Sequence, residues 1–194
     1  MNSVALKDIA SIQLGYSFRE GLSSDPNAPV RVVQMRDLGD DHVVDLENAD
    51  RVDLEPPPHQ WLQRGDILVR SRGESVTSAI VDADVDTVIA AAPLLRIRVT
   101  SSSILPQYLN WIINQEPSQA YFAKNIEGSN VKMISRRALE ELPVEVPPIE
   151  QQEKVTELAG LAAREKRLVE VIGKHRDELL SHVMLNYVKG GASQ

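Results

Sequence analysis

A pair of prolines, Pro147 and Pro148, divides this chain into two parts of different character. Proline fixes φ and biases the preceding residue away from the α region, so an extended segment ends here. The next residues, 150–153, are Glu-Gln-Gln-Glu, and acidic groups are favoured at the positive end of a helix dipole. From there to about Tyr187 the sequence has no proline and keeps a helical period. We therefore predict a globular body at 1–149, one long helix at 150–188 and a frayed tail at 189–194.

The body mixes strand-like and helix-like segments without a regular alternation, which predicts an α+β fold. Segments rich in β-branched residues predict strands at 30–35, 67–69, 79–81 and 88–99, the last broken at Pro93. Helical spacing predicts a helix at 106–114, a second beginning near 119, and a short turn at 136–142 capped by Ser135. Residues 4–14 are expected to form one short amphipathic element.

The long helix carries an apolar stripe at three- and four-residue spacing. Its residues are Val155, Leu158, Ala162, Val169, Ile172, Leu179 and Val183. A helix of about 38 residues is roughly 55 Å long, and alone it would leave this stripe in water. We therefore expect the stripe to pair with another helix as a coiled coil. Folding of the helix back onto its own body is the open alternative.

The formal net charge is −7, and its distribution says more than the total. Residues 150–194 hold seven basic and seven acidic side chains, so the whole excess of acid lies in the body. Residues 37–55 alone hold eight acids and one arginine. Such a run is usually a solvated edge, and the balanced remainder of the body is compatible with binding a polyanion.

The chain lacks the residues that most catalytic and metal sites need. There is no cysteine, which excludes disulfides and thiolate chemistry and suits a reducing, cytoplasmic location. No run is long enough to span a membrane. Phosphate-loop, dinucleotide and nucleophile-elbow motifs are missing, and the four histidines share no metal-ligand spacing. Asp82, Asp84 and Asp86 alternate as on one strand face, where solvated carboxylates are expected. We predict a protein without catalysis, metal or cofactor of its own.

Four segments resemble the specificity (S) subunits of type I restriction–modification systems. LKDIASIQLGYSF at 6–18 resembles the opening segment of that family, and LQRGDILVRSRG at 62–73 resembles its Gly-Asp-Ile-Leu strand. EGSNVKMISRRALEELPVEVPPIEQQEKV at 127–155 is similar to its exit segment, and the long helix follows in the expected place. The exit segment is the most specific of the four.

The resemblance implies a half-sized S subunit. Typical members carry two target-recognition domains, each followed by a long helix, and the two helices pair antiparallel. This chain has one of each, so two copies would pair through 150–188 as a homodimer and read a palindromic, bipartite double-stranded DNA target. The family also binds methyltransferase (modification) subunits, which hold S-adenosylmethionine. Participation of a restriction subunit stays open.

Specific DNA readout needs bidentate donors for guanine and amide groups for adenine. The candidates lie after two strands and around a Gly-Ser turn, and each could equally be an ordinary surface residue. They are Gln34, Arg36, Arg70, Ser71, Arg72, Lys124, Ser129, Asn130 and Lys132. The alternative function is a protein-only adaptor that uses the acidic segment and the helix without binding DNA.

Overall fold

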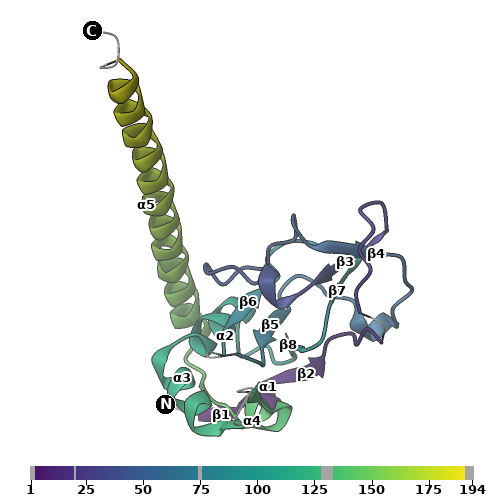
Figure 1. Ribbon diagram of the computed structural model, residues 1–194. Coiled ribbons are helices and arrows are strands. Elements are labelled where there is room, and N and C mark those ends of the chain that lie inside the picture. The colour runs from purple at the N-terminus through teal and green to yellow at the C-terminus, as the bar shows by residue number, and fades with distance from the viewer. Residues whose placement is uncertain (1–2, 20, 74–75, 128–132, 191–194) are drawn as a thin grey trace. The chain divides into compact units, whose positions relative to one another are not determined.

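The computed structural model describes residues 3–19, 21–73, 76–127 and 133–190, and the chain forms two compact units, Met1–Thr156 and Glu157–Gln194 (Figure 1). The first unit mixes sheets and short helices, and the second is the continuation of one helix. The α+β prediction and the prediction of a long C-terminal helix are confirmed. The strands are β1 (Ser3–Ala5), β2 (Ala10–Leu14), β3 (Val30–Val33), β4 (Asp50–Val52), β5 (Ile67–Arg70), β6 (Ser78–Ile80), β7 (Val88–Ala90), β8 (Leu94–Val99), β9 (Ile126–Glu127), β10 (Met133–Ile134) and β11 (Pro143–Glu145). The helices are α1 (Leu6–Ile9), η1 (Met35–Asp37), η2 (Pro58–Gln60), α2 (Pro106–Ile113), α3 (Glu116–Asn125), α4 (Arg136–Glu140) and α5 (Ile149–Gly190).

A four-stranded antiparallel sheet with the order β2-β8-β5-β6 forms the centre of the domain (Figure 1). Its inner strand β5 is an unbroken Ile-Leu-Val run, and all three side chains are fully buried. Such a run is typical of a strand that is covered on both faces. Ile67 pairs with Ile97 of β8 on one side and with Ile80 of β6 on the other.

A second sheet, with the order β4-β3-β7, packs its own small core. Strand β3 pairs antiparallel with β4 and parallel with β7, where Val32 lies opposite Ile89. The predicted break at Pro93 is confirmed, because residues 88–99 form two strands in different sheets, β7 and β8. Proline cannot donate a ladder hydrogen bond, so the chain changes sheet at this point.

The N-terminus and the exit segment lie side by side in a two-stranded sheet, β1 with β11. Leu6 and Ile9 of α1 are buried in the main core with Leu109 of α2 and Leu142. The expectation of one amphipathic element at 4–14 is wrong. Leu6, Ile9 and Ile12 point into the core from a single helical turn and a strand, whereas Leu14 at the end of β2 is exposed.

The triple-aspartate segment also differs from its expectation. Residues 82–86 contain no strand, so Asp82, Asp84 and Asp86 do not share a strand face, although all three are exposed as expected. The β5–β6 pairing extends only to Val81, which donates to the backbone carbonyl oxygen of Asp66 and accepts from the backbone N–H of Gly65. Among the helices of the described residues, none combines the length and apolar character that a bilayer crossing needs.

Candidate nucleic-acid interface

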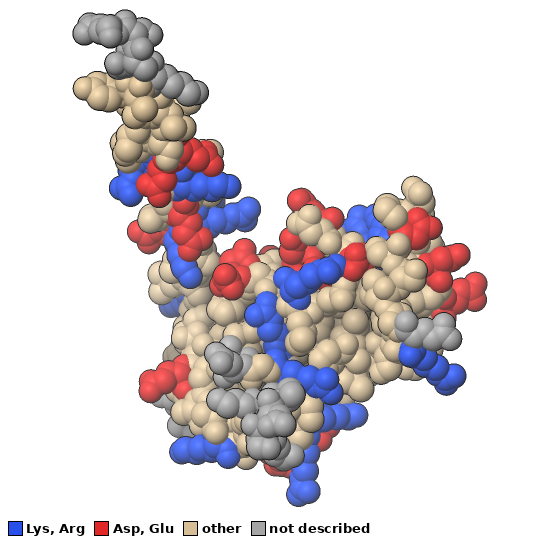
Figure 2. Space-filling view, in the orientation of Figure 1, with Lys and Arg blue, Asp and Glu red and all other residues tan. Residues whose placement is uncertain are grey.

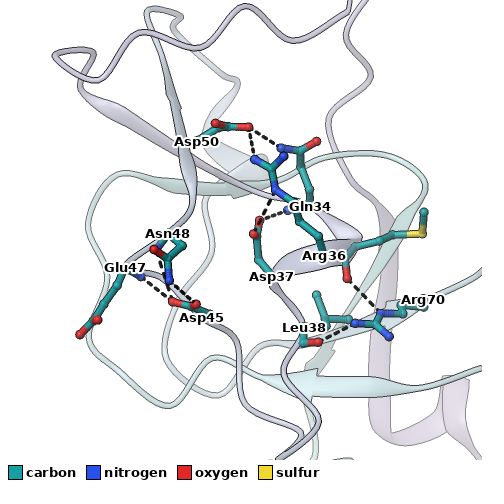
Figure 3. Close-up of polar contacts among 10 residues, drawn as sticks. Gln34, Arg36, Asp37, Leu38, Asp45, Glu47, Asn48, Asp50 and Arg70 are labelled. Atoms are coloured by element: carbon teal, nitrogen blue, oxygen red, sulfur yellow. Dashed lines mark hydrogen bonds and ion pairs between the residues drawn. The ribbon is translucent and has the colours of Figure 1, made fainter. Parts of the chain in front are cut away.

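The end of strand β5 brings together two segments of candidate residues. Arg70 donates from Nε to the carbonyl oxygen of Met35 at 3.0 Å and from its terminal nitrogen to that of Leu38 at 2.5 Å (Figure 3). Met35 begins η1, which directly follows Gln34 and contains Arg36. The hydrogen bonds of the Arg70 guanidinium therefore hold η1 against β5. They also fix the position of the exposed Arg36, which lies in η1.

The next two residues join the same strand end to the β9–β10 hairpin. Ser71 is buried, and its Oγ donates to the carbonyl oxygen of Pro93 at 2.6 Å. Its backbone carbonyl oxygen accepts from the N–H of Ile134 at 2.9 Å. Arg72 forms an antiparallel bridge with Met133 and is exposed. Ser71 thus has internal partners, whereas the Arg72 side chain lies at the surface.

Strand β10 pairs with β9, which directly follows helix α3. Lys124 is in the last turn of α3 and is exposed. The structure therefore places segments around residues 36, 72 and 124 on connected elements, although they are far apart in sequence. Three further candidates, Ser129, Asn130 and Lys132, lie outside the described residues.

Arg36 takes part in a small polar cluster with residues of β4 and η1 (Figure 3). It forms an ion pair with Asp50, whose carboxylate also accepts from Nε2 of Gln34 at 2.7 Å. Asp37 is buried and accepts from the backbone N–H of Gln34 at 2.7 Å. Burial raises the pKa of Asp37, against the opposing effect of its hydrogen bond to Gln34 and of the Arg36 charge. The Arg36 side chain is still 60% exposed, so its ion pair leaves it accessible.

The acidic segment is more than the solvated edge expected from its composition. Asp45 accepts from the backbone N–H groups of Glu47 and Asn48 and from Nδ2 of Asn48 at 2.7 Å (Figure 3). These hydrogen bonds, that from the Asn48 side chain first, lower the pKa of Asp45. Figure 2 shows acidic side chains gathered on the lobe of β3 and β4, and basic ones across the middle of the domain. Asp45 therefore stabilises the loop at 45–48, and the acidic segment also makes the lobe of β3 and β4 negatively charged.

An ion pair between the buried Asp66 and the half-buried Arg98 lies at the other end of β5, where the strand begins. Asp66 is fully buried and binds Arg98 through two hydrogen bonds of 2.6 and 2.7 Å. The hydrogen bond and the charge of Asp66 raise the pKa of Arg98. Arg96 donates to the carbonyl oxygen of His59 at 2.8 Å and to Oε1 of Gln13 at 2.6 Å. Arg96 and Arg98 alternate along β8 and so share a strand face, where they bind neighbouring segments of the domain.

Gln152 anchors the start of α5 to the domain. Its side chain is fully buried, accepts from the backbone N–H of Leu105 at 2.8 Å, and donates to the carbonyl oxygens of Ser103 and Pro147 at 2.8 and 2.7 Å. Sequence reasoning noted the Glu-Gln-Gln-Glu turn but missed this role. The available signal was an amide at the fourth position after the two prolines, and the sequence alone does not distinguish it from the exposed amide of Gln151.

The predicted dimerisation stripe divides into two parts. Val155 is half-buried and packs against the core of its own domain. The other stripe residues are exposed along α5: Leu158, Ala162, Val169, Ile172, Leu179 and Val183. A helix rarely leaves so many large apolar side chains in water without a partner.

Within the described part of the chain, no group of three or more His, Asp or Glu side chains is placed to hold a metal ion. Asp37, Asp45, Asp50 and Asp66 each have hydrogen-bond partners within the domain. The arrangement at the end of β5 offers cationic donors on a fixed scaffold, which suits recognition of a polyanion.

The sequence matches no protein-family model and no curated protein. Solved structures do match. One is a chain from "Structural basis underlying complex assembly and conformational transition of the type I R-M system", with a TM-score of 0.70 and 15% identity over 94% of this chain and 43% of that one. Another is the HsdS subunit from Thermoanaerobacter tengcongensis, with a TM-score of 0.53 and 18% identity over 85% and 37%. A third is the type I S subunit from M. genitalium, with a TM-score of 0.58 and 13% identity over 91% and 42%.

These similarities show that the chain has the fold of type I S subunits. The chain spans about two fifths of the length of the structures that it matches.

Proposed function

We propose that this protein is a non-catalytic, sequence-specific DNA-recognition subunit of a type I-like restriction–modification complex. The observation that carries the proposal is the S-subunit fold of a recognition domain joined to one long helix with an exposed apolar stripe. Two copies pair through their helices and present two identical domains to a palindromic, bipartite target, whose spacer depends on the helix length.

The DNA contacts come from the end of β5 and the elements connected to it. Arg36, Arg72 and Lys124 are exposed and can reach base edges or phosphates. Arg70 and Ser71 act as positioning residues, because their side chains bind backbone carbonyls of neighbouring segments. Gln34, which binds Asp50, acts in the same way, and Ser129, Asn130 and Lys132 are candidates from sequence alone.

The protein works with a methyltransferase subunit that binds S-adenosylmethionine, in the cytoplasm. A second apolar stripe on α5, containing Leu161 and Leu168, offers that subunit a surface beside the one used for self-pairing. With a net charge of −7, the chain alone grips phosphate weakly, so most non-specific affinity comes from the partner. A restriction subunit joins the same complex in systems that also cleave.

The test uses the complex of this chain with its methyltransferase subunit and a DNA pool from which the bound target is selected. Replacing Arg72 by Ala is expected to weaken binding to the selected target about tenfold or more, since one bidentate base contact contributes about 1–3 kcal/mol. The matched control is Arg64→Ala, because Arg64 is also exposed but pairs with Asp82 away from β5's end. Equal binding by both variants would remove Arg72 from the interface.

The acidic lobe favours one other function, a protein-only adaptor. That function predicts no salt-sensitive DNA binding by the complex, whereas DNA recognition predicts an affinity that falls steeply as salt rises. Measuring the affinity at two salt concentrations with and without this chain separates the two functions.

A further inference from the structure

The apolar stripe on α5 follows a three-and-four spacing that two charged residues interrupt. From Val155 to Asn186 this spacing defines ten positions, of which seven are the stripe residues named above. Asn186 closes the series, and Glu165 and Arg176 interrupt it. This is the heptad pattern of a coiled-coil seam, in which each such position faces the partner helix.

Neither charged residue has an opposite charge at helical distance on its own helix. Ion pairs along a helix form between residues three or four apart. At those distances Glu165 and Arg176 have only apolar residues or glycine, which are Leu161, Ala162, Leu168 and Val169 around the first and Ile172, Gly173, Leu179 and Leu180 around the second. Within the described helix, Arg176 contacts the adjacent Asp177 at 3.5 Å, and both side chains are 71% exposed. Such a solvated contact contributes little.

The ten positions are symmetric about the bond between Glu170 and Val171. Counted from that point, Val169 and Ile172 are equally distant, as are Glu165 and Arg176. The remaining pairs are Ala162 with Leu179, Leu158 with Val183, and Val155 with Asn186. An antiparallel pair of identical helices has a two-fold axis at its centre, and that axis makes equally distant residues face each other.

We infer that Glu165 of one copy pairs with Arg176 of a second copy, and that these two symmetric ion pairs fix an antiparallel register centred between Glu170 and Val171. The inference rests on the self-pairing proposed above and specifies how it occurs. In this register every interrupting charge meets its opposite, Asn186 lies opposite the half-buried Val155, and the remaining layers are apolar.

In the competing arrangements the same two charges face like charges or apolar residues. In a parallel pair, Glu165 faces the Glu165 of the other copy, and the arginines also face each other. An antiparallel pair shifted by one heptad places Glu165 against Val169 or Val183, and Arg176 against Leu158 or Ile172. A charge in a seam without a partner is costly, and a polar seam residue is an established way of selecting register. The two charges therefore select the arrangement more than they strengthen it.

Charge reversal in the full-length protein tests this pairing. The dissociation constant of the dimer is measured by sedimentation for the wild type, Glu165→Arg, Arg176→Glu and the double variant. Each single reversal opposes like charges in two layers and is expected to raise the dissociation constant about tenfold or more, while the double reversal restores it to within about threefold. The controls are Glu170→Arg and Lys174→Glu, which make the same charge changes outside the seam and should leave the constant within about threefold.

The outcomes separate the register from the proposed self-pairing. A wild type that stays monomeric at high concentration overturns both. A wild-type dimer whose single reversals behave like the controls overturns the register alone, because in a parallel pair each reversal only exchanges one like-charge layer for another. Circular dichroism checks that the helix persists, and an equimolar mixture of the two single variants should form a tight heterodimer even if each variant alone does not.

Disulfide formation gives a second measurement that is independent of charge. The chain has no native cysteine, so introduced thiols report cleanly. Antiparallel pairing puts the two copies of residue 158 about 37 Å apart, so Leu158→Cys alone should not cross-link. A mixture of Leu158→Cys with Val183→Cys should cross-link into a heterodimer. Efficient cross-linking of Leu158→Cys with itself would indicate parallel pairing and overturn the inference.

Discussion

Leucines and charged residues in the core of the domain are buried or paired, but the same residue types are exposed on helix α5. Leu68 in β5 is completely buried, whereas Leu179 in α5 is 64% exposed. Asp66 is buried against Arg98, while Glu165 and Arg176 have only apolar residues or glycine three and four residues away on their own helix. The domain therefore buries or pairs these groups internally, whereas the helix leaves them at its surface, where the proposed second copy would cover them.

The difference predicts where substitutions act. Changes inside the domain should lower the free energy of unfolding of the isolated chain. The same changes on α5 should leave the domain intact and act on association. The following substitutions either sharpen this division or contradict it.

Leu68→Ala should have the largest effect on the domain. It removes a fully buried side chain from the middle strand and is expected to lower the free energy of unfolding by about 3–5 kcal/mol. Urea denaturation of the full chain measures it. The matched variant is Leu179→Ala, which should change the unfolding of the domain by less than about 0.5 kcal/mol. A large effect of Leu179→Ala on domain unfolding would indicate that the helix packs on its own body.

Asp66→Ala should destabilise the domain almost as much as Leu68→Ala. It leaves Arg98 without the carboxylate that accepts two of its hydrogen bonds, and the backbone N–H of Gln63 loses an acceptor. Breaking a buried pair is expected to destabilise the domain by about 3 kcal/mol, because one charge stays in place without compensation. The comparison variant, Asp82→Ala, breaks an exposed pair with Arg64 and should fall within about 0.5 kcal/mol of the wild type. Similar melting of the two variants would contradict a structural role for the buried pair.

Local sequence signals predicted the elements that local residues determine. The Ile-Leu-Val run predicted β5, Ser135 predicted a capped turn, and the proline pair predicted the start of α5. The sequence at 4–14 misled because its apolar residues belong to three short elements, and Leu6, Ile9 and Ile12 are buried whereas Leu14 is exposed. Composition could not show this, since the partners come from distant segments, β11 for β1 and β8 for β2.

The candidate site was only partly predictable for the same reason. The segments around Arg36, Arg72 and Lys124 were chosen from strand ends and turns, and the structure connects them through β5 and the β9–β10 hairpin. The internal partners of Arg70 and Asp66 could not be read from the sequence, because they lie 32 or more residues away. Partners that are distant in sequence decide whether an arginine side chain binds another segment of the domain or stays exposed at the surface.

Gln152→Ala should have a smaller effect, at the junction between the two regions. It removes three hydrogen bonds and leaves the partly buried N–H of Leu105 without its acceptor. A loss of about 2 kcal/mol in the unfolding of the domain is expected. Gln151→Ala is the control, because the neighbouring amide is exposed. Hydrogen exchange should also show faster opening of the first helical turn, and unchanged exchange would contradict the anchoring role.

The smallest effect on stability is expected for the ion pair of Arg36 with Asp50. The Arg36 side chain is 60% exposed, so a double-mutant cycle with Arg36→Ala and Asp50→Ala should give a coupling below about 1 kcal/mol. DNA binding by the complex should respond differently, because Arg36→Ala removes a cationic donor, whereas Asp50→Ala removes only a competing carboxylate. We therefore expect Arg36→Ala to weaken binding and Asp50→Ala to leave it unchanged or to strengthen it. Equal losses of DNA affinity from both substitutions would indicate that the ion pair acts only by shaping η1. Arg36 would then be a positioning residue like Arg70, and not a DNA contact.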